Sequence, residues 1–252
     1  MSLIAMASGK GGVGKTCLAI GLAQALAEAG QRALLVDADL GLANVDVQLG
    51  LDPLRDLGDV LAGRCAMANA VLRHAGGFDV LPGRSGSAGL AALNGAALSG
   101  FAAQLRGLGA DAVVLDLGAG IGPAQRGLAA LADLLIVVAT EEPTSLTDAY
   151  AVLKLHRRDA PSGRAALLVN MSVQPARVHA TLDAACRGFL GRGLPLLGAI
   201  RRDPRVPAAI RAQMPLLTRH PNTPAAEDLR VLATALCAVL PLAPAALLSS
   251  GR

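Results

Sequence analysis

A glycine-rich segment near the start of the chain constrains the fold more than any other feature. It follows an apolar run at residues 3–8, opens a helix-like stretch at residues 15–29, and consists of Gly9, Lys10, Gly11, Gly12, Val13, Gly14, Lys15 and Thr16. A strand, a glycine-rich turn and a helix in this order are the context of a P-loop, whose backbone N–H groups and helix N-terminus hold phosphate oxygens. The segment therefore predicts a nucleotide-binding site in an α/β fold.

Two side chains of this loop carry the expected chemistry. In a P-loop, the lysine reaches the β- and γ-phosphates, and the hydroxyl residue after it is a ligand of Mg²⁺. These roles are assigned to Lys15 and Thr16. The glycines of the loop, Val13 and Cys17 complete the predicted nucleotide-binding segment.

Apolar runs and helix-like stretches alternate along the rest of the chain. The apolar runs cover residues 3–8, 33–37, 78–82, 112–116, 134–140, 165–170 and 195–200. The helix-like stretches cover residues 15–29, 56–74, 89–108, 123–132, 144–158 and 175–190. Continuous apolar runs are typical of strands buried on both faces, and their alternation with helices predicts a three-layer, doubly wound α/β fold with a mainly parallel sheet.

The end of the chain is also apolar. Residues 231–249 carry no charge, but they include Pro241 and Pro244, and apolar residues fall at helical spacing before them. We therefore expect a terminal helix at about 222–240 that packs on the domain, followed by a short apolar tail at 241–252, rather than a membrane span. No long linker or internal repeat divides the chain, so we expect one P-loop ATPase domain over residues 1–252.

Carboxylates follow two of the predicted strands. Asp37 and Asp39 stand at the end of the run 33–37, and Asp116 ends the run 112–116. The carboxyl ends of parallel strands form the mouth of an α/β site, where such carboxylates can hold Mg²⁺ through water and orient an attacking water. Asp116 has the position of a Walker B aspartate, and the glycine-rich residues 117–120 after it are interpreted as a switch segment.

The composition excludes several classes of function. The chain has no Trp, one Tyr and three Phe, so an aromatic platform for single-stranded nucleic acid is absent. The net charge of +4 comes from arginines that are spread thinly, which makes nucleic acid an unexpected partner. Four separated cysteines without a CxxC motif predict neither a disulfide framework nor an iron–sulfur or zinc site. The first residues do not resemble a signal peptide, so we expect a cytoplasmic protein.

The additional lysine of the loop, Lys10, indicates a narrower group of P-loop proteins. The string KGGVGKT resembles the deviant Walker A motif of the MinD/ParA family, which belongs to the SIMIBI type of P-loop NTPase. The resemblance implies ATP and ADP as ligands with Mg²⁺, and an ATP-dependent homodimer. It also implies that Lys10 contacts the phosphates of the facing subunit and that Asp39 is catalytic and close to the metal. By the same resemblance, Asn170 hydrogen-bonds adenine, and Arg202 and Asp203 lie in the loop that flanks the base.

Two further strings resemble the FlhG/FleN branch of this family, which controls the number and placement of bacterial flagella. They are residues 37–51 and 141–156, where Thr144 alone would be interpreted as a helix cap. The branch implies a partner such as an FlhF-type GTPase or a flagellar regulator, and a location that extends to the inner membrane or the cell pole. ParA-like segregation of DNA or cargo and MinD-like placement of the division site are the alternatives.

The chain departs from the family pattern at three places. It begins at the first strand, so the N-terminal extension that stimulates the GTPase partner is expected to be missing. Its tail has one basic residue and two prolines, which predicts weak or no membrane binding. Cys17 stands where the family has a hydroxyl residue near the α-phosphate, and a thiol is a weaker donor.

Overall fold

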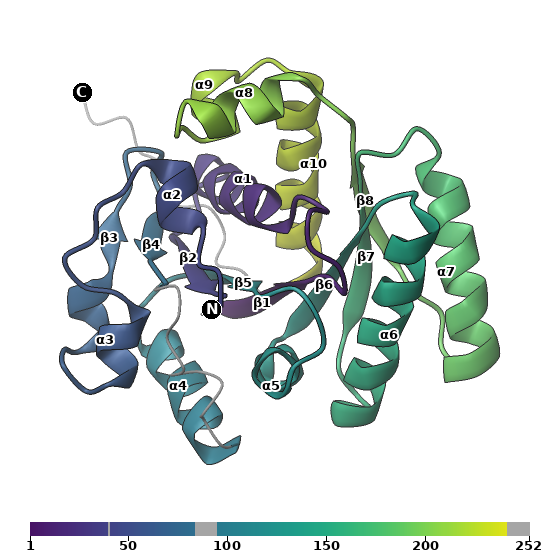
Figure 1. The fold of residues 1–252 in the computed structure, drawn as a ribbon, viewed down its shortest axis with the longest axis horizontal. Helices are drawn as coiled ribbons and strands as arrows, with labels where there is room; N and C mark the ends of the chain where they lie inside the picture. Colours follow the sequence, from purple (N-terminus) through teal and green to yellow (C-terminus); the bar gives the residue numbers. More distant parts are fainter. Residues whose placement is uncertain (40, 84–94, 241–252) are drawn as a thin grey trace.

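An eight-stranded sheet forms the centre of the computed structural model, which describes residues 1–39, 41–83 and 95–240 (Figure 1). The strands lie in the order β3-β4-β2-β5-β1-β6-β7-β8, and every neighbouring pair is parallel except β3 and β4. Their bounds are β1 (Ser2–Ala7), β2 (Ala33–Ala38), β3 (Leu72–Arg73), β4 (Asp79–Leu81), β5 (Ala112–Leu117), β6 (Leu134–Ala139), β7 (Ala165–Asn170) and β8 (Leu196–Ile200).

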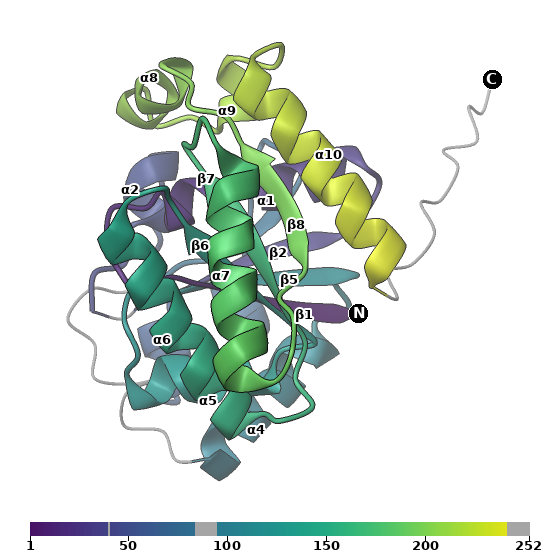
Figure 2. The ribbon, with the colours of Figure 1, turned by 90° about the vertical axis from the view of Figure 1, so that its right-hand side faces the viewer.

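Helices cover both faces of the sheet and make three layers (Figures 1 and 2). The face with α1 carries α1 (Lys15–Glu28), α2 (Val45–Leu49), α8 (Arg205–Arg211), α9 (Leu216–Arg219) and α10 (Pro224–Val239). The opposite face carries α3 (Leu57–Leu61), α4 (Gly95–Gly107), α5 (Pro123–Leu131), α6 (Pro143–Asp159) and α7 (Pro175–Leu190). Strands buried on both faces explain the continuous apolar runs, and the predicted doubly wound, mainly parallel fold is confirmed.

The two cores are almost entirely aliphatic. One lies between the sheet and α1 with α10, and the other lies between the sheet and α4 to α7. Burying an aliphatic side chain such as Leu22 or Leu115 contributes roughly 1.5–3 kcal/mol. Helix α10 buries Leu229, Leu232 and Leu236 in the first core, so the terminal helix packs on the domain. Among the described residues, no helix is both long and apolar enough to cross a membrane.

The prediction of one helix at residues 56–74 is wrong. The structure has the short helix α3, a 3₁₀ turn at Met67–Ala70 and strand β3 in this region. Asp56 and Asp59 begin α3 with a reciprocal capping box, and the helix ends before Gly63, whose φ of 71° favours glycine. The apolar spacing is helical, but local backbone signals stop the helix after five residues.

Smaller differences concern the helix ends. Helix α6 begins at Pro143 after Glu142, so Thr144 lies inside the helix and is not its cap. Helices α2, α8 and α9 were not predicted, because elements of four to seven residues show no clear periodicity. The predicted residues 89–94 and the tail 241–252 lie outside the described part of the chain.

Candidate functional site

The P-loop joins the end of β1 to the start of α1 and is shaped by glycines. Gly12 and Gly14 have φ values of 81° and 86°, which side chains other than glycine rarely adopt. A Cβ on Gly14 would lie 2.5 Å from Nδ2 of Asn170. That amide nitrogen donates a hydrogen bond to the carbonyl oxygen of Val13 at 2.7 Å. Asn170, at the end of β7, therefore supports the loop directly.

Lys15 lies inside the site and pairs with Asp116. Its Nζ is 2.6 Å from Oδ1 of Asp116, and the two side chains are only 7% and 1% exposed. Strand pairing places Met6 of β1 beside Asp116 of β5, so the P-loop begins next to this carboxylate. Burial raises the pKa of Asp116, while the charge of Lys15 and a hydrogen bond from Thr16 lower it.

Asp37 organises the segment that carries Asp39. Its carboxylate accepts hydrogen bonds from the backbone N–H groups of Asp39, Asn44 and Val45 at 3.1, 2.9 and 3.0 Å. The pKa of Asp37 is raised to about 7, because burial and, to a smaller extent, the nearby carboxylate of Asp116 outweigh the backbone hydrogen bonds, which lower it. Sequence reasoning assigned no such role to Asp37; a polar residue ending a continuous apolar run was the available signal.

Asp39 lies at the rim of the site, where its carboxylate is held by the chain that follows it. Oδ1 of Asp39 accepts hydrogen bonds from the N–H groups of Gly41 and Leu42 at 3.2 and 3.1 Å. The same oxygen would be 2.9 Å from a Cβ on Gly118, which follows β5. The predicted switch segment therefore passes against the predicted catalytic carboxylate, and a side chain at position 118 would require the side chain of Asp39 to shift.

Two hollows meet at the P-loop. The first, here called the P-loop hollow, has a volume of about 360 Å³ and is lined by Ser8, Lys10, Gly11, Gly12, Val13, Gly14, Lys15, Thr16, Cys17, Asp39, Leu42, Asn44, Gln48, Ala119 and Ile210. The second, here called the apolar pocket, has about 390 Å³ and is lined by Gly12, Gly14, Cys17, Leu18, Asn170, Met171, Ile200, Arg201, Arg202, Asp203, Pro204, Val206, Pro207, Ile210, Leu216, Ala225 and Leu229. One hollow contains the two lysines and Thr16, the other is mainly apolar, and they share four residues; together they suit a ligand with a charged and an apolar half.

The loop after β8 forms one wall of the apolar pocket. Arg201 anchors this loop to α10 through Asp228 and Glu227, with Nη2 at 2.8 and 2.9 Å from their carboxylates. Asp203 accepts hydrogen bonds from the N–H groups of Arg205 and Ala225. The structure thus brings the predicted Arg202 and Asp203 to the pocket, and it adds Arg201 as the residue that fixes their position.

Cys17 and Lys10 occupy different environments at this site. Cys17 lines both hollows, and burial raises the pKa of its thiol to about 11. Lys10 points instead to the start of α6, where its Nζ is 2.7 Å from Oε2 of Glu142 and 3.2 Å from Oγ1 of Thr144. The bond to Lys10 lowers the pKa of Glu142. Sequence reasoning did not identify Glu142 as a partner of the loop.

The donors at the P-loop hollow fit Mg²⁺ with a nucleotide. Thr16 and Asp39 line this hollow, and the buried Asp116 interacts with Lys15 and Thr16 next to it; all three offer hard oxygen donors, which Mg²⁺ prefers. Within residues 1–39, 41–83 and 95–240, no cluster of three or more His, Cys, Asp or Glu could hold a metal ion alone. In nucleotide sites, one or two carboxylates and the substrate phosphates usually hold Mg²⁺ together.

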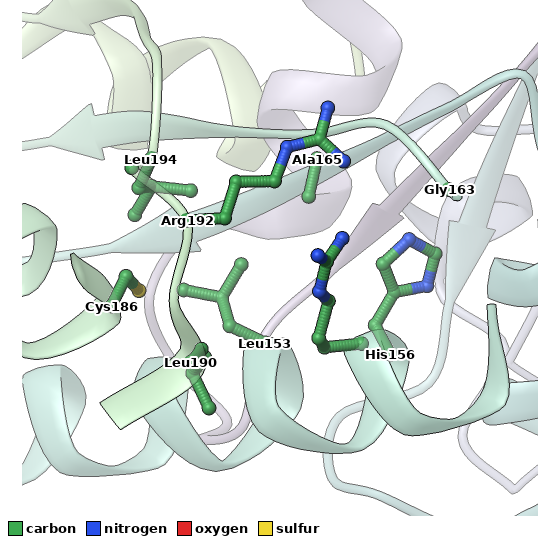
Figure 3. Close-up of a pocket in the computed structure, with 10 residues that line it drawn as sticks. Leu153, His156, Gly163, Ala165, Cys186, Leu190, Arg192 and Leu194 are labelled. Atoms are coloured by element: carbon green, nitrogen blue, oxygen red, sulfur yellow. The ribbon is translucent and has the colours of Figure 1, made fainter. Parts of the chain in front are cut away.

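A third hollow lies at the opposite end of the sheet, before β7 and β8 (Figure 3). It measures about 40 Å³, and Leu153, Leu190, Cys186, His156 and Arg192 are among its lining residues. His156 is buried, and burial lowers its pKa. This volume is far below that of a nucleotide-binding pocket.

Comparison with known proteins agrees with this geometry. Residues 4–216 match the family model described as the CobQ/CobB/MinD/ParA nucleotide binding domain. The chain therefore belongs to this family, and it is a P-loop ATPase whose ligands are ATP or ADP with Mg²⁺.

The chain is also similar to individual proteins whose names indicate their roles. The chain is 37% identical to the antiactivator FleN of Pseudomonas aeruginosa, over 92% of this chain and 85% of FleN. It is 32% identical to the flagellum site-determining protein YlxH of Helicobacter pylori, over 87% of this chain and 76% of YlxH. Among solved structures, MinD of Pyrococcus horikoshii with Mg-ADP has a TM-score of 0.79 and 26% identity, with 92% of this chain and 94% of that one covered.

Proposed function

We propose that this protein is a Mg²⁺-dependent ATPase that acts as a dimeric switch controlled by ATP. The observation that carries the proposal is the different direction of the two lysines in one loop. Lys15 is buried beside Asp116, whereas the side chain of Lys10 is 41% exposed and pairs with Glu142, which is 62% exposed. An exposed pair of this kind contributes only about 0–1 kcal/mol, so Lys10 can leave Glu142 and reach the phosphates of a second copy.

Exposed apolar side chains surround the same end of the sheet and support a dimer there. Leu42, Ile121 and Val173 are 71%, 47% and 80% exposed, and each follows the carboxyl end of a strand. Parallel strands place their carboxyl ends at one edge, so these residues share the edge with the P-loop. A second copy of the chain, facing the first across the P-loop hollows, would cover them.

In this proposal, different residues of the chain have different roles in hydrolysis. Asp39, which the N–H groups of Gly41 and Leu42 hold, would orient a water and accept its hydrogen bond. Lys15 supplies positive charge inside the hollow, and Thr16 with Asp116 would hold the metal. Mg²⁺, when bound, neutralises charge on the phosphate oxygens. The segment after β5, which touches Asp39 at Gly118, is the proposed sensor of hydrolysis.

The apolar pocket is the proposed site of the adenine base. Asn170 uses its amide nitrogen on Val13, which leaves its carbonyl oxygen for the base. Arg202 and Asp203 form the flanking wall, in a loop that α10 holds in place. Cys17 lies at the border of the two hollows, where the α-phosphate is expected.

We infer that the output of the switch is the number or placement of flagella, supported by the similarity to FleN and YlxH over most of the chain. A flagellar regulator or an FlhF-type GTPase is the proposed partner, at the inner membrane or the cell pole. Division-site placement is the second candidate, because MinD of Bacillus subtilis is 36% identical over 66% of this chain.

Light scattering during size exclusion tests the switch. We expect a dimer with ATP and a monomer with ADP, and we expect Lys10→Ala to bind ATP but remain monomeric. A dimer of Lys10→Ala with wild-type turnover would contradict the mechanism. Counting flagella and measuring cell length in a deletion strain tests the output: altered flagella with normal division supports the flagellar role, and division defects with normal flagella support the second candidate.

A further inference from the structure

Gln213, between α8 and α9, connects two parts of the site that are far apart in the sequence. Its Nε2 donates a hydrogen bond to the carbonyl oxygen of Val47 in α2 at 2.9 Å. The backbone of Gln213 has a φ of 53°, which residues other than glycine rarely adopt. This conformation places the side chain against α2, where its Cβ approaches Gly50, the residue that ends α2.

One end of this connection is the apolar pocket. Helix α8 lines the pocket with Val206, Pro207 and Ile210, and Ile210 also lines the P-loop hollow. The backbone N–H of Gln213 donates to the carbonyl oxygen of Ile210 at 3.0 Å. A ligand that packs on α8 can therefore shift the turn that carries Gln213.

The other end of the connection is the segment that carries Asp39. Helix α2 begins at Val45, whose N–H donates to Oδ2 of Asp37. Oδ1 of the same carboxylate accepts the N–H of Asp39. Helix α2 and Asp39 are thus fixed by one buried side chain, and a displacement of α2 changes the hydrogen bonds that place Asp39.

We propose that Gln213 is a positioning residue that couples occupation of the apolar pocket by a base to the placement of Asp39. The inference rests on the proposed function, because it takes the apolar pocket as the base site and Asp39 as the residue that orients water. The consequence of this coupling is that ATP, whose base fills the pocket, is hydrolysed faster than a triphosphate without a base. Chains of hydrogen bonds and packed side chains carry such coupling, and it has to be measured as a difference between ligands.

Amide hydrogen exchange with two probes measures this difference. Inorganic pyrophosphate with Mg²⁺ occupies only the P-loop hollow, whereas ADP with Mg²⁺ also fills the apolar pocket. In the wild-type protein we expect ADP to slow exchange in residues 44–49 more than pyrophosphate does. The variant Gln213→Glu replaces the donor with an acceptor, and we expect ADP and pyrophosphate to give equal protection there, while both still protect residues 9–16.

Turnover provides a second measurement on the full chain. We expect Gln213→Glu to lower kcat for ATP about three- to tenfold, the factor that one ordinary hydrogen bond carries, with KM changed less than twofold. Gln213→Lys keeps a donor and should retain at least half of wild-type kcat. Gln104→Glu, at an exposed glutamine of α4, makes the same chemical change away from the site and should match wild type.

A Gln213→Glu protein with wild-type kcat and with the extra protection by ADP intact would overturn the coupling alone. A wild-type protein that binds pyrophosphate but neither binds ADP nor hydrolyses ATP would instead refute the proposed function.

Discussion

The two ends of the parallel sheet differ in what their polar groups do. At the carboxyl end, β1, β2 and β5 bring Lys15, Asp37, Asp39 and Asp116 together beside hollows of about 360 and 390 Å³. At the amino end, the hollow beside His156 has about 40 Å³, and leucines and Arg192 are among its lining residues (Figure 3). The helices that follow parallel strands begin at the carboxyl ends of those strands, and ligands of open α/β sheets bind there.

The charged residues at the two ends of the sheet also differ in what surrounds them. Lys15, which pairs with the buried Asp116, lines a hollow large enough for a ligand, so its charge can be shared with that ligand. By contrast, Arg126 and Asp159 form a two-bond pair that ties α5 to α6. We therefore expect changes at the carboxyl end to alter function, and changes at the amino end to alter stability.

Asp39→Ala tests the carboxyl end most strongly. Removal of the carboxylate leaves the water without an acceptor, and groups of this kind contribute roughly 10²–10⁴-fold to turnover. We expect phosphate release to fall at least about a hundredfold, while the ATP dimer persists in light scattering. Asp52→Ala, at an exposed aspartate before α3, is the control and should hydrolyse ATP normally. An Asp39→Ala protein that binds ATP but stays monomeric would refute the assigned role.

Lys15→Gln tests the buried charge. Glutamine keeps a donor toward Asp116 but removes the positive charge from the P-loop hollow. Hydrogen bonds to charged groups contribute about 1.5–3 kcal/mol, so we expect affinity for ATP to fall at least about tenfold in titration calorimetry. Lys154→Gln, at an exposed lysine of α6, should bind ATP as the wild type does. Unchanged affinity in Lys15→Gln would show that the backbone of the loop holds the phosphates without this charge.

Asn170→Ala separates the two hollows at the carboxyl end. The side chain supports the loop through Val13 and faces the apolar pocket. We expect pyrophosphate affinity to fall about threefold and ADP affinity about tenfold, since ADP loses one further hydrogen bond of about 1 kcal/mol. Asn69→Ala, at an exposed asparagine, is the control. Equal losses for both ligands would contradict the proposed contact between Asn170 and the base. An unchanged pyrophosphate affinity would contradict the support of the loop by Asn170.

The sequence allowed most of the architecture to be predicted, because periodicity and burial agree in the long elements. The apolar run 112–116 lies within β5 and residues 175–190 match α7. The helix predicted at 56–74 failed because apolar spacing favoured it while Gly63 and the capping pair ended it early. Short helices such as α8 leave no periodic signal, yet they form a wall of the apolar pocket.

The residues of the candidate site also fall into those that the sequence predicts and those that it does not. Lys15, Thr16 and Asp116 follow from a local motif and from strand ends, and the structure brings them together. The contact of Lys10 with Glu142 and that of Gln213 with Val47 join segments 132 and 166 residues apart. Such contacts depend on how helices pack over the sheet, and no spacing in a single sequence encodes them.

His156→Leu tests the amino end, where we expect no effect on ADP affinity. Neither ring nitrogen makes a well-formed hydrogen bond within the described residues, although the backbone of Arg164 and the carboxylate of Asp159 favour the protonated ring. Burial outweighs them and lowers the pKa of His156, so the unfolded chain binds the proton more tightly than the folded protein. Stability from this residue is therefore complete above the ordinary pKa near 6.5 and is lost as the pH falls below it.

The measurement is the free energy of unfolding in urea between pH 5 and pH 7.5. One linked proton limits the slope to about 1.4 kcal/mol per pH unit, and we expect His156→Leu to lose the part of the slope that this histidine contributes. At pH 7.5, where the ring is neutral in both states, ADP affinity serves as the control and should equal that of wild type. A variant with the wild-type slope would show that His156 titrates alike in both states. A variant with weaker ADP binding would show that the amino end is not separate from the site.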